Sequence, residues 1–232
     1  MGRYIQVEKY TSRKIKSFVL RTGRMSTMQK KALVSFAPLY CIKFREQILD
    51  FNALYKNSND TFLEIGFGMG HATIEIAERN PDKNYLGVEV HTPGVGRVLN
   101  EINTRKLDNL RIIRHDAVEV LEHMIGSETL NGVHLFFPDP WPKKKHFKRR
   151  LIQKEFVSSI LPKLKPGGYI YVATDWEPYA EWILEIFQSF QELKNRYNPY
   201  ADKIDWRPAT SFERKGIEKN HKIRNIWFEK LY

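Results

Sequence analysis

The residues most suited to chemistry begin with a glycine-rich segment, Glu-Ile-Gly-Phe-Gly-Met-Gly, that starts at Glu64. It would join a strand to a helix, where glycines let the backbone approach a ligand closely. Its glycines are Gly66, Gly68 and Gly70, whereas a dinucleotide fingerprint would need a glycine at position 71, which is His71. The Glu64 carboxylate would repel a pyrophosphate but attract a ligand with a cationic amino group and a sulfonium. The segment therefore favours S-adenosylmethionine over a dinucleotide.

Two further acids end the next two predicted strands. Glu89 stands in Leu-Gly-Val-Glu-Val, where a carboxylate can accept hydrogen bonds from both hydroxyls of a ribose. Asp116 stands in Arg-His-Asp-Ala, where an adenine amino group would lie. Taken singly, each acid could instead cap the following helix. Three acids at consecutive strand ends, with Glu64 as the first, outline a site for adenosine joined to an amino acid.

A proline-rich loop follows the strand expected in the middle of the sheet. It reads Phe-Phe-Pro-Asp-Pro-Trp-Pro-Lys and contains Asp139, Trp141 and Lys143. Its prolines remove backbone donors and stiffen the chain, so the loop would hold Asp139 and Trp141 in fixed positions. A plain turn built from Pro and Asp is the alternative for the loop. Trp141 could either stack on a nucleic-acid base or pack against the loop itself.

Basic residues are concentrated in two runs. The chain has 38 Lys and Arg against 27 Asp and Glu, a net charge of +11 and a pI near 9.6. One run lies within residues 1–31, and the other covers residues 143–150 beside the proline-rich loop. A single run would usually be a solvated surface, but two runs so placed favour nucleic acid as the partner. The candidate phosphate contacts are Arg21, Arg24, Lys144, Lys145, Lys148, Arg149 and Arg150, and His146 is interpreted as a surface residue.

The elements that must position these residues alternate between strand and helix. Strands are predicted at residues 61–65, 85–90, 110–114, 133–137, 169–174 and 223–228. Helices are predicted at residues 71–79, 94–105, 117–124 and 150–161, and from 175 to about 190. This alternation is typical of an α/β fold with a mostly parallel sheet and crossover helices. Before it, residues 1–50 are predicted to form a basic arm and a helix over 27–49, and residues 51–232 the main domain.

Other features narrow the class of protein. Cys41 is the only cysteine, which rules out an intrachain disulfide and a cysteine-based metal site, and no metal is expected. The apolar stretches are strand-sized, well short of the roughly 20 residues that a membrane span needs. The N-terminus lacks an apolar signal core, so a cytoplasmic protein is expected. The sequence leaves open whether the chain works as a monomer or a homodimer.

These motifs together resemble a known family. Glu-Ile-Gly-Phe-Gly-Met-Gly and Phe-Pro-Asp-Pro-Trp-Pro-Lys look like those of the tRNA (guanine-N7)-methyltransferases, the TrmB-type enzymes. The resemblance extends to Gly-Val-Glu-Val-His-Thr-Pro-Gly at 87–94 and Ser-Phe-Val-Leu-Arg at 17–21, and so covers nearly the whole chain. It implies a Rossmann-like class I methyltransferase with a mostly parallel seven-stranded sheet and helices on both faces. Residues 216–220 depart from the Gly- and Arg-rich tail usual in the family.

The resemblance also implies a reaction and its residues. The methyl group of S-adenosylmethionine would go to N7 of the guanine at position 46, in the variable loop of tRNA. By position, Glu64, Glu89 and Asp116 match cofactor contacts, with Gly66, Gly68 and Gly70 forming the cofactor loop, and Asp139 matches the catalytic residue. The matching substrate contacts are Asp139, Lys143, Asp175, Thr210, Ser211, Phe212 and Glu213.

This chemistry is consistent with the residues. Guanine N7 already holds an in-plane lone pair, so the enzyme mainly has to place it in line with the methyl group. Asp139 could accept hydrogen bonds from N1–H and the exocyclic amine as positive charge develops on the ring, and Asp175 could share this role. Two alternatives are methylation of another RNA base and a non-catalytic RNA-binding protein with a vestigial methyltransferase fold.

Overall fold

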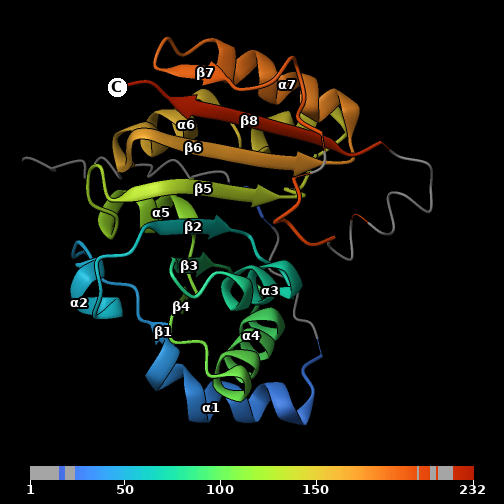
Figure 1. Ribbon diagram of the computed structural model, residues 1–232. Coiled ribbons are helices and arrows are strands. Elements are labelled where there is room, and N and C mark those ends of the chain that lie inside the picture. Colours follow the sequence, from blue (N-terminus) through green and yellow to red (C-terminus); the bar gives the residue numbers. More distant parts are fainter. Residues whose placement is uncertain (1–15, 19–23, 203, 210–212, 214–221) are drawn as a thin grey trace, which may run out of the picture.

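The computed structural model describes residues 16–18, 24–202, 204–209, 213 and 222–232. In this part of the chain, strands form one sheet in the order β1-β4-β3-β2-β5-β6-β8-β7 (Figure 1). Their bounds are β1 Cys41–Ile42, β2 Thr61–Ile65, β3 Asn84–Val88, β4 Leu110–Ile113, β5 Leu130–Phe136, β6 Leu164–Thr174, β7 Leu193–Asn195 and β8 Arg224–Lys230. The pairings from β1 to β6 are parallel, and β8 and β7 are antiparallel to their neighbours.

The helices are α1 Thr27–Tyr40, α2 Phe51–Tyr55, α3 His71–Arg79, α4 Thr92–Arg105, α5 Ala117–His123, α6 Lys154–Ile160 and α7 Glu177–Gln188, with 3-10 helices η1 Lys144–Arg149 and η2 Leu161–Lys163. Helix α1 precedes β1, and each of α2 to α7 lies between two successive strands. Among the described residues, none of these helices is both long and apolar enough to cross a bilayer.

Side-chain alternation along the strands divides the core into two layers. In β2, Phe62 packs in the layer that contains α3 and α4, whereas Leu63 packs in the layer that contains α5, α6 and α7. Every residue of β2 and β3 is buried, as expected for parallel strands covered on both faces. Helices therefore cover both faces of a mostly parallel sheet, which confirms the predicted fold class (Figure 1).

Strand order determines where a ligand can bind. From β2 the chain proceeds through β3 to β4 on one side of the sheet, then crosses to β5 and β6 on the other side of β2. The boundary between β2 and β5 is therefore a topological switch point. In open α/β sheets, ligands bind at the carboxyl ends of the strands beside such a point.

The segment before β2 is built onto the same sheet. Helix α1 begins with a capping box in which Ser26 and Gln29 exchange hydrogen bonds. It packs on α4, where the absence of a side chain at Gly96 permits close contact: a Cβ there would lie 2.7 Å from the Gln29 carbonyl oxygen. After α1, Cys41 and Ile42 pair with β4.

The predicted elements agree with the structure over most of the sheet, and several bounds differ. The six strands predicted by residue range are all present, and the two-residue β1 and three-residue β7 join the edges, so the described residues form eight strands where the resemblance implied seven. The first helix ends at Tyr40 rather than at residue 49, since the chain then enters β1. The helix expected from residue 150 begins at Lys154, because residues 144–149 form η1.

Candidate active site

The four acids singled out in the sequence line one cavity at the carboxyl ends of the central strands. Its volume is about 520 Å³, within the usual range for small-molecule sites. Glu64 belongs to β2, Glu89 follows β3, Asp116 precedes α5, and Asp139 follows β5. We call this cavity the central pocket. Its position at the switch point agrees with the strand order.

The glycine-rich segment forms the turn between β2 and α3 along the pocket. Gly66, Gly68 and Gly70 all have positive φ values, of 76°, 56° and 68°, which L side chains rarely adopt. The first residues of α4 press against this turn: a Cβ on Gly94 would lie 1.8 Å from the Gly68 carbonyl oxygen. The turn is therefore fixed both by its own conformation and by α4.

Glu89 orders the same turn. Its Oε2 accepts a hydrogen bond from the Gly68 N–H at 2.6 Å, and its Oε1 accepts from the N–H groups of Val90 and His91 at 2.6 and 2.8 Å. The side chain is buried but lines the pocket. A carboxylate held by three backbone donors keeps its position, which is a requirement for orienting a ligand.

Glu64 is the most strongly perturbed acid of the pocket. Burial raises its pKa to about 8, the neighbouring Thr73 hydroxyl acts in the opposite direction, and the charge of Glu89 raises it further. A carboxyl group in such a place is protonated near neutral pH unless a cation accompanies it. The environment thus favours a positively charged group beside Glu64.

Asp116 caps α5, one of the two roles considered for it, and it also lines the pocket. One carboxylate oxygen accepts a hydrogen bond from the Val118 N–H at 3.1 Å and caps α5. The other lies 3.4 Å from the Nζ of Lys16. Ser17 and Phe18, next in the chain, also line the pocket, and sequence reasoning missed them because nothing in the pattern predicts where this segment returns.

The loop after β5 carries Asp139 into the pocket. We call residues 138–141 the Pro-Asp-Pro-Trp loop. Phe137 and Trp141, which flank Asp139, have positive φ values of 54° and 43°. Residues other than glycine keep such backbone angles only where the surrounding structure holds them. The Phe137 N–H donates to the Ala173 carbonyl oxygen of β6 at 2.7 Å, which anchors the loop at its start.

Trp141 packs within the loop region, one of the two alternatives left open above. The Arg149 guanidinium lies 4.4 Å from the ring centroid, and the His146 ring meets it edge-on at 5.6 Å. The indole Nε1 donates to the Ser17 carbonyl oxygen at 3.2 Å. Trp141 thereby connects η1 and the segment at residues 16–18 to the Pro-Asp-Pro-Trp loop.

The basic run of η1 is exposed except at its end. Lys143, Lys144, Lys145 and Lys148 are exposed beside the Pro-Asp-Pro-Trp loop, and Arg24 is exposed before α1. Arg21 lies outside the described residues.

Arg150 corrects the sequence prediction of a phosphate contact, since it is only 3% exposed. Its Nε donates to the Pro140 carbonyl oxygen at 2.9 Å, and its guanidinium lies 3.7 to 5.0 Å from the ring centroids of Phe147, Tyr179 and Trp182. Arg150 therefore braces the Pro-Asp-Pro-Trp loop from inside the protein.

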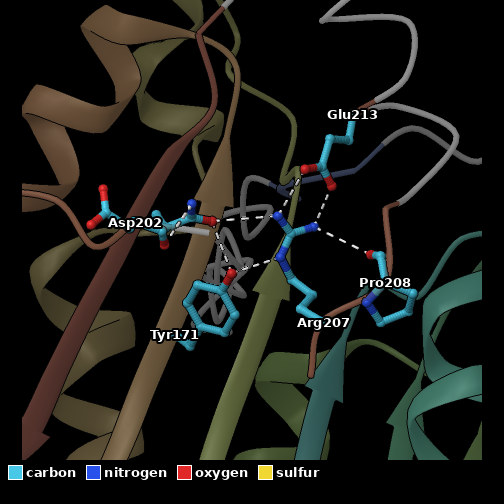
Figure 2. Close-up of polar contacts among 6 residues, drawn as sticks. Tyr171, Asp202, Arg207, Pro208 and Glu213 are labelled. Carbon is cyan, nitrogen blue, oxygen red and sulfur yellow. Dashed lines mark hydrogen bonds and ion pairs between the residues drawn. The ribbon is translucent and has the colours of Figure 1, made fainter. Parts of the chain in front are cut away.

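The remaining predicted substrate contacts are partly described. Asp175 is half-buried directly after β6. Residues 210–212, which include Thr210, Ser211 and Phe212, lie outside the described residues. Glu213 is buried and forms a two-pronged ion pair with Arg207, at 2.5 and 3.1 Å (Figure 2). Sequence reasoning missed Arg207, which carries no motif of its own.

In the described part of the chain, no group of three or more His, Cys, Asp or Glu side chains is placed to hold a metal ion. The arrangement instead offers acids for a cationic, hydroxyl-bearing ligand, a fixed carboxylate on a rigid loop, and exposed lysines beside it.

Comparisons with known proteins agree with this arrangement. A family model described as a putative methyltransferase matches residues 58–226. A tRNA (guanine-N(7)-)-methyltransferase of Methylobacillus flagellatus is 50% identical over 224 residues, covering 96% of this chain and 94% of the relative. That of Nitrosospira multiformis is 49% identical and covers 97% and 98%. Among solved structures, the aminoglycoside resistance methyltransferase NpmB1 matches with a TM-score of 0.58 at 14% identity, over 80% of this chain and 95% of that one, which bears on the fold alone.

Proposed function

The chain belongs to the tRNA (guanine-N(7)-)-methyltransferase family, and from this premise we propose that it transfers the methyl group of S-adenosylmethionine to N7 of a guanine in tRNA, at position 46 of the variable loop. The observation that carries the proposal is the central pocket, which gathers Glu64, Glu89, Asp116 and Asp139 from four successive strand ends. All four acids come from one chain. With tRNA as the substrate, we propose that the protein acts in the cytoplasm.

The pocket residues fit the cofactor. S-adenosylmethionine, when bound, supplies an electrophilic methyl group on a sulfonium. Glu64 is proposed to bind its cationic amino-acid end, because a cation beside the buried carboxyl favours the ionised form and offsets the effect of burial on the pKa. Glu89 is proposed to accept from the ribose hydroxyls and Asp116 from the adenine amino group, since both side chains line the pocket. The glycine turn, which includes Gly66, Gly68 and Gly70, admits the ligand close to the backbone.

Asp139 is proposed to orient the guanine. Its carboxylate accepts hydrogen bonds from N1–H and the exocyclic amine, which strengthen as positive charge develops on the ring during transfer. Guanine N7 needs no general base, since its lone pair is already available. Asp175, after β6, and Lys143, two residues beyond the loop, are proposed to contact the substrate.

The exposed lysines of η1 are proposed to bind tRNA phosphates. Lys144, Lys145 and Lys148 lie directly beyond the Pro-Asp-Pro-Trp loop, where the backbone of an RNA entering the pocket would pass. Phosphate contacts of this kind position a nucleic acid without reading its sequence.

Incubation with labelled S-adenosylmethionine and unmodified tRNA tests the proposal. Borohydride and aniline treatment cleaves RNA at 7-methylguanine, so a single cleavage in the variable loop is expected. Label at another base would point to a different specificity, and no label with intact tRNA binding would point to a non-catalytic RNA-binding protein.

The role of Asp139 has its own test. Asp139→Ala should abolish transfer while largely preserving S-adenosylmethionine affinity, because the side chain acts on the guanine. The exposed Asp108→Ala serves as the matched control. Full activity in Asp139→Ala would remove this residue from the mechanism.

A further inference from the structure

Arg207 is one of the most completely buried side chains described, with an exposed fraction of 1%. Its guanidinium has a partner on every side (Figure 2). Besides the ion pair with Glu213, Nε donates to the Tyr171 hydroxyl oxygen at 2.6 Å and Nη2 donates to the Asn225 Oδ1 at 3.4 Å. Tyr171 and Asn225 belong to the adjacent strands β6 and β8. The guanidinium therefore joins residues 204–209 to β6 and β8.

The same guanidinium lies over the start of the loop that carries Asp139. It is 5.6 Å from the ring centroid of Phe136 and 5.9 Å from that of Phe137, and both rings line the central pocket. Phe137 is the residue with a positive φ of 54° two positions before Asp139. A strained backbone angle persists only where neighbouring groups over-determine it. The neighbours of Phe137 include the Arg207 guanidinium and the Ala173 carbonyl oxygen, which accepts a hydrogen bond from the Phe137 N–H.

Burying an ion pair is an expensive way to stabilise a fold. Desolvation of both charges offsets much of their attraction, and apolar residues of similar volume often serve as well. Although burial by itself lowers the pKa of the Arg207 guanidinium, its hydrogen bond to Glu213 and the charges around it raise the pKa overall. The residue is therefore a permanent cation with fixed directions for its donors, which an apolar replacement cannot reproduce.

We propose that Arg207 is a positioning residue for methyl transfer, which holds the entrance of the Pro-Asp-Pro-Trp loop against the sheet so that Asp139 faces the pocket at one angle. This role rests on the proposed function of Asp139. A displacement of about 1 Å at a reacting group can cost a hundredfold in rate, so a residue that fixes the loop affects turnover without touching the substrate.

The test compares Arg207→Met and Arg207→Lys with Arg196→Met, which removes an exposed arginine that pairs with Glu229. Turnover is measured per folded molecule, at a temperature where circular dichroism shows each variant folded. Arg207→Met should lower kcat about tenfold to a hundredfold, with unchanged affinity for S-adenosylmethionine. Arg207→Lys should keep more thermal stability than Arg207→Met but recover little kcat, because an ammonium lacks the planar set of donors. Arg196→Met should behave as wild type.

Amide exchange separates positioning from a purely structural role. The Phe137 amide should exchange at least about tenfold faster in Arg207→Met than in wild type, while amides of β2 keep their protection. The double variant Arg207→Met/Glu213→Gln removes both buried charges, so it should regain thermal stability without regaining Phe137 protection.

Wild-type protection of Phe137 or wild-type kcat in folded Arg207→Met would overturn the proposal, as would joint recovery of stability and protection in the double variant. If the wild-type protein itself transfers no methyl group to tRNA, the proposed function fails, and the exchange of Phe137 still decides whether Arg207 positions the loop.

Discussion

Glu64 lies at the carboxyl end of β2 with its side chain buried beside a second acid, Glu89. The sequence alone shows that an acidic residue precedes the glycine turn. Whether its carboxyl group is protonated depends on the cavity that surrounds it. Because burial raises its pKa from an ordinary 4.5 to about 8, the free protein holds Glu64 neutral near pH 7. Ligand binding and ionisation of this group are therefore coupled.

One prediction concerns the stability of the ligand-free protein. Between about pH 4.5 and pH 8 the folded chain keeps a proton on Glu64 that the unfolded chain has lost, so the free energy of unfolding falls as the pH rises through this window. The slope from this group is about 1.4 kcal/mol per pH unit, and the loss is complete above the folded pKa. Glu64→Gln has no carboxyl group to titrate, so its free energy of unfolding does not fall in this way. The difference between the free energies of unfolding of Glu64→Gln and wild type should therefore shift in favour of the variant as the pH rises through this window. Urea unfolding at several pH values measures it.

The control for Glu64→Gln is the exposed Glu185→Gln on α7, which should follow wild type at every pH. The same Glu64→Gln protein should bind S-adenosylmethionine more weakly in calorimetry, because a neutral amide cannot pair with the cationic end of the ligand. A stability difference that stays constant with pH would contradict the buried, protonated state of Glu64.

Single residues also show where a sequence stops being informative. Glu64, Glu89, Asp116 and Asp139 could be predicted to meet, because the carboxyl ends of parallel strands share one edge. Arg150 could not be told apart from the exposed basic residues before it, since its burial depends on aromatic rings that α7 and η1 supply. Arg207 has the same character, because its burial depends on Tyr171 of β6 and Asn225 of β8 as well as on the nearby Glu213.

At the scale of elements, the glycine turn and the beginning of α4 act as one unit. Gly94 stands in the first turn of α4, and a side chain there would meet the Gly68 carbonyl oxygen at 1.8 Å, a distance that no real Cβ contact tolerates. The obstacle is backbone, so it cannot rotate away. Either α4 or the turn must move.

Gly94→Ala should therefore displace the turn and weaken S-adenosylmethionine binding by about tenfold or more, with some loss of thermal stability. Calorimetric titration and thermal unfolding measure the two effects. Gly126→Ala is the matched control: its Cβ would meet only the side-chain ends of Thr129 and Ile48, at 3.1 and 3.2 Å, which can shift slightly. Unchanged cofactor affinity in Gly94→Ala would show that the turn does not need its contact with α4.

The sequence predicted β2 and α3 with the bounds that the structure has. Both signals used, the periodicity of apolar residues and the glycines between the two elements, are local in the sequence. The edges of the sheet were harder. β1 consists of Cys41 and Ile42 alone, and its pairing with β4 ends α1 at Tyr40 instead of at residue 49. β7 is a three-residue strand that exists only through its pairing with β8. Such short strands are stabilised by tertiary contacts that leave no period in the sequence.

At the scale of the whole molecule, two opposite electrostatic environments adjoin each other. The central pocket is lined by four carboxyl groups, although the chain as a whole has a net charge of +11. The Pro-Asp-Pro-Trp loop lies between this pocket and the exposed lysines of η1, and Trp141 contacts both η1 and the segment at residues 16–18. A cationic cofactor would meet the carboxyl groups of the pocket, and a polyanionic tRNA would meet the lysines of η1. Asp139, the residue proposed to align the two, lies on the loop between them.

This division of charge predicts how tRNA binding responds to salt. Each phosphate neutralised by a lysine releases counterions, so the logarithm of the tRNA affinity should fall linearly with the logarithm of the salt concentration. Replacing Lys144 and Lys145 with glutamine should flatten the slope by roughly 0.7 to 0.9 per lost phosphate contact and leave S-adenosylmethionine affinity unchanged. Filter binding over a salt series measures the slope.

The matched control is the double replacement of Lys43 and Lys194 by glutamine, which removes the same total charge at exposed positions outside η1. If net charge alone attracted tRNA, both double variants would change the slope equally. If η1 supplies the contacts, only the Lys144 and Lys145 variant changes it, because counterion release depends on phosphates actually covered rather than on total charge. A salt response in the parent protein that is already flat would contradict a phosphate-binding role for η1.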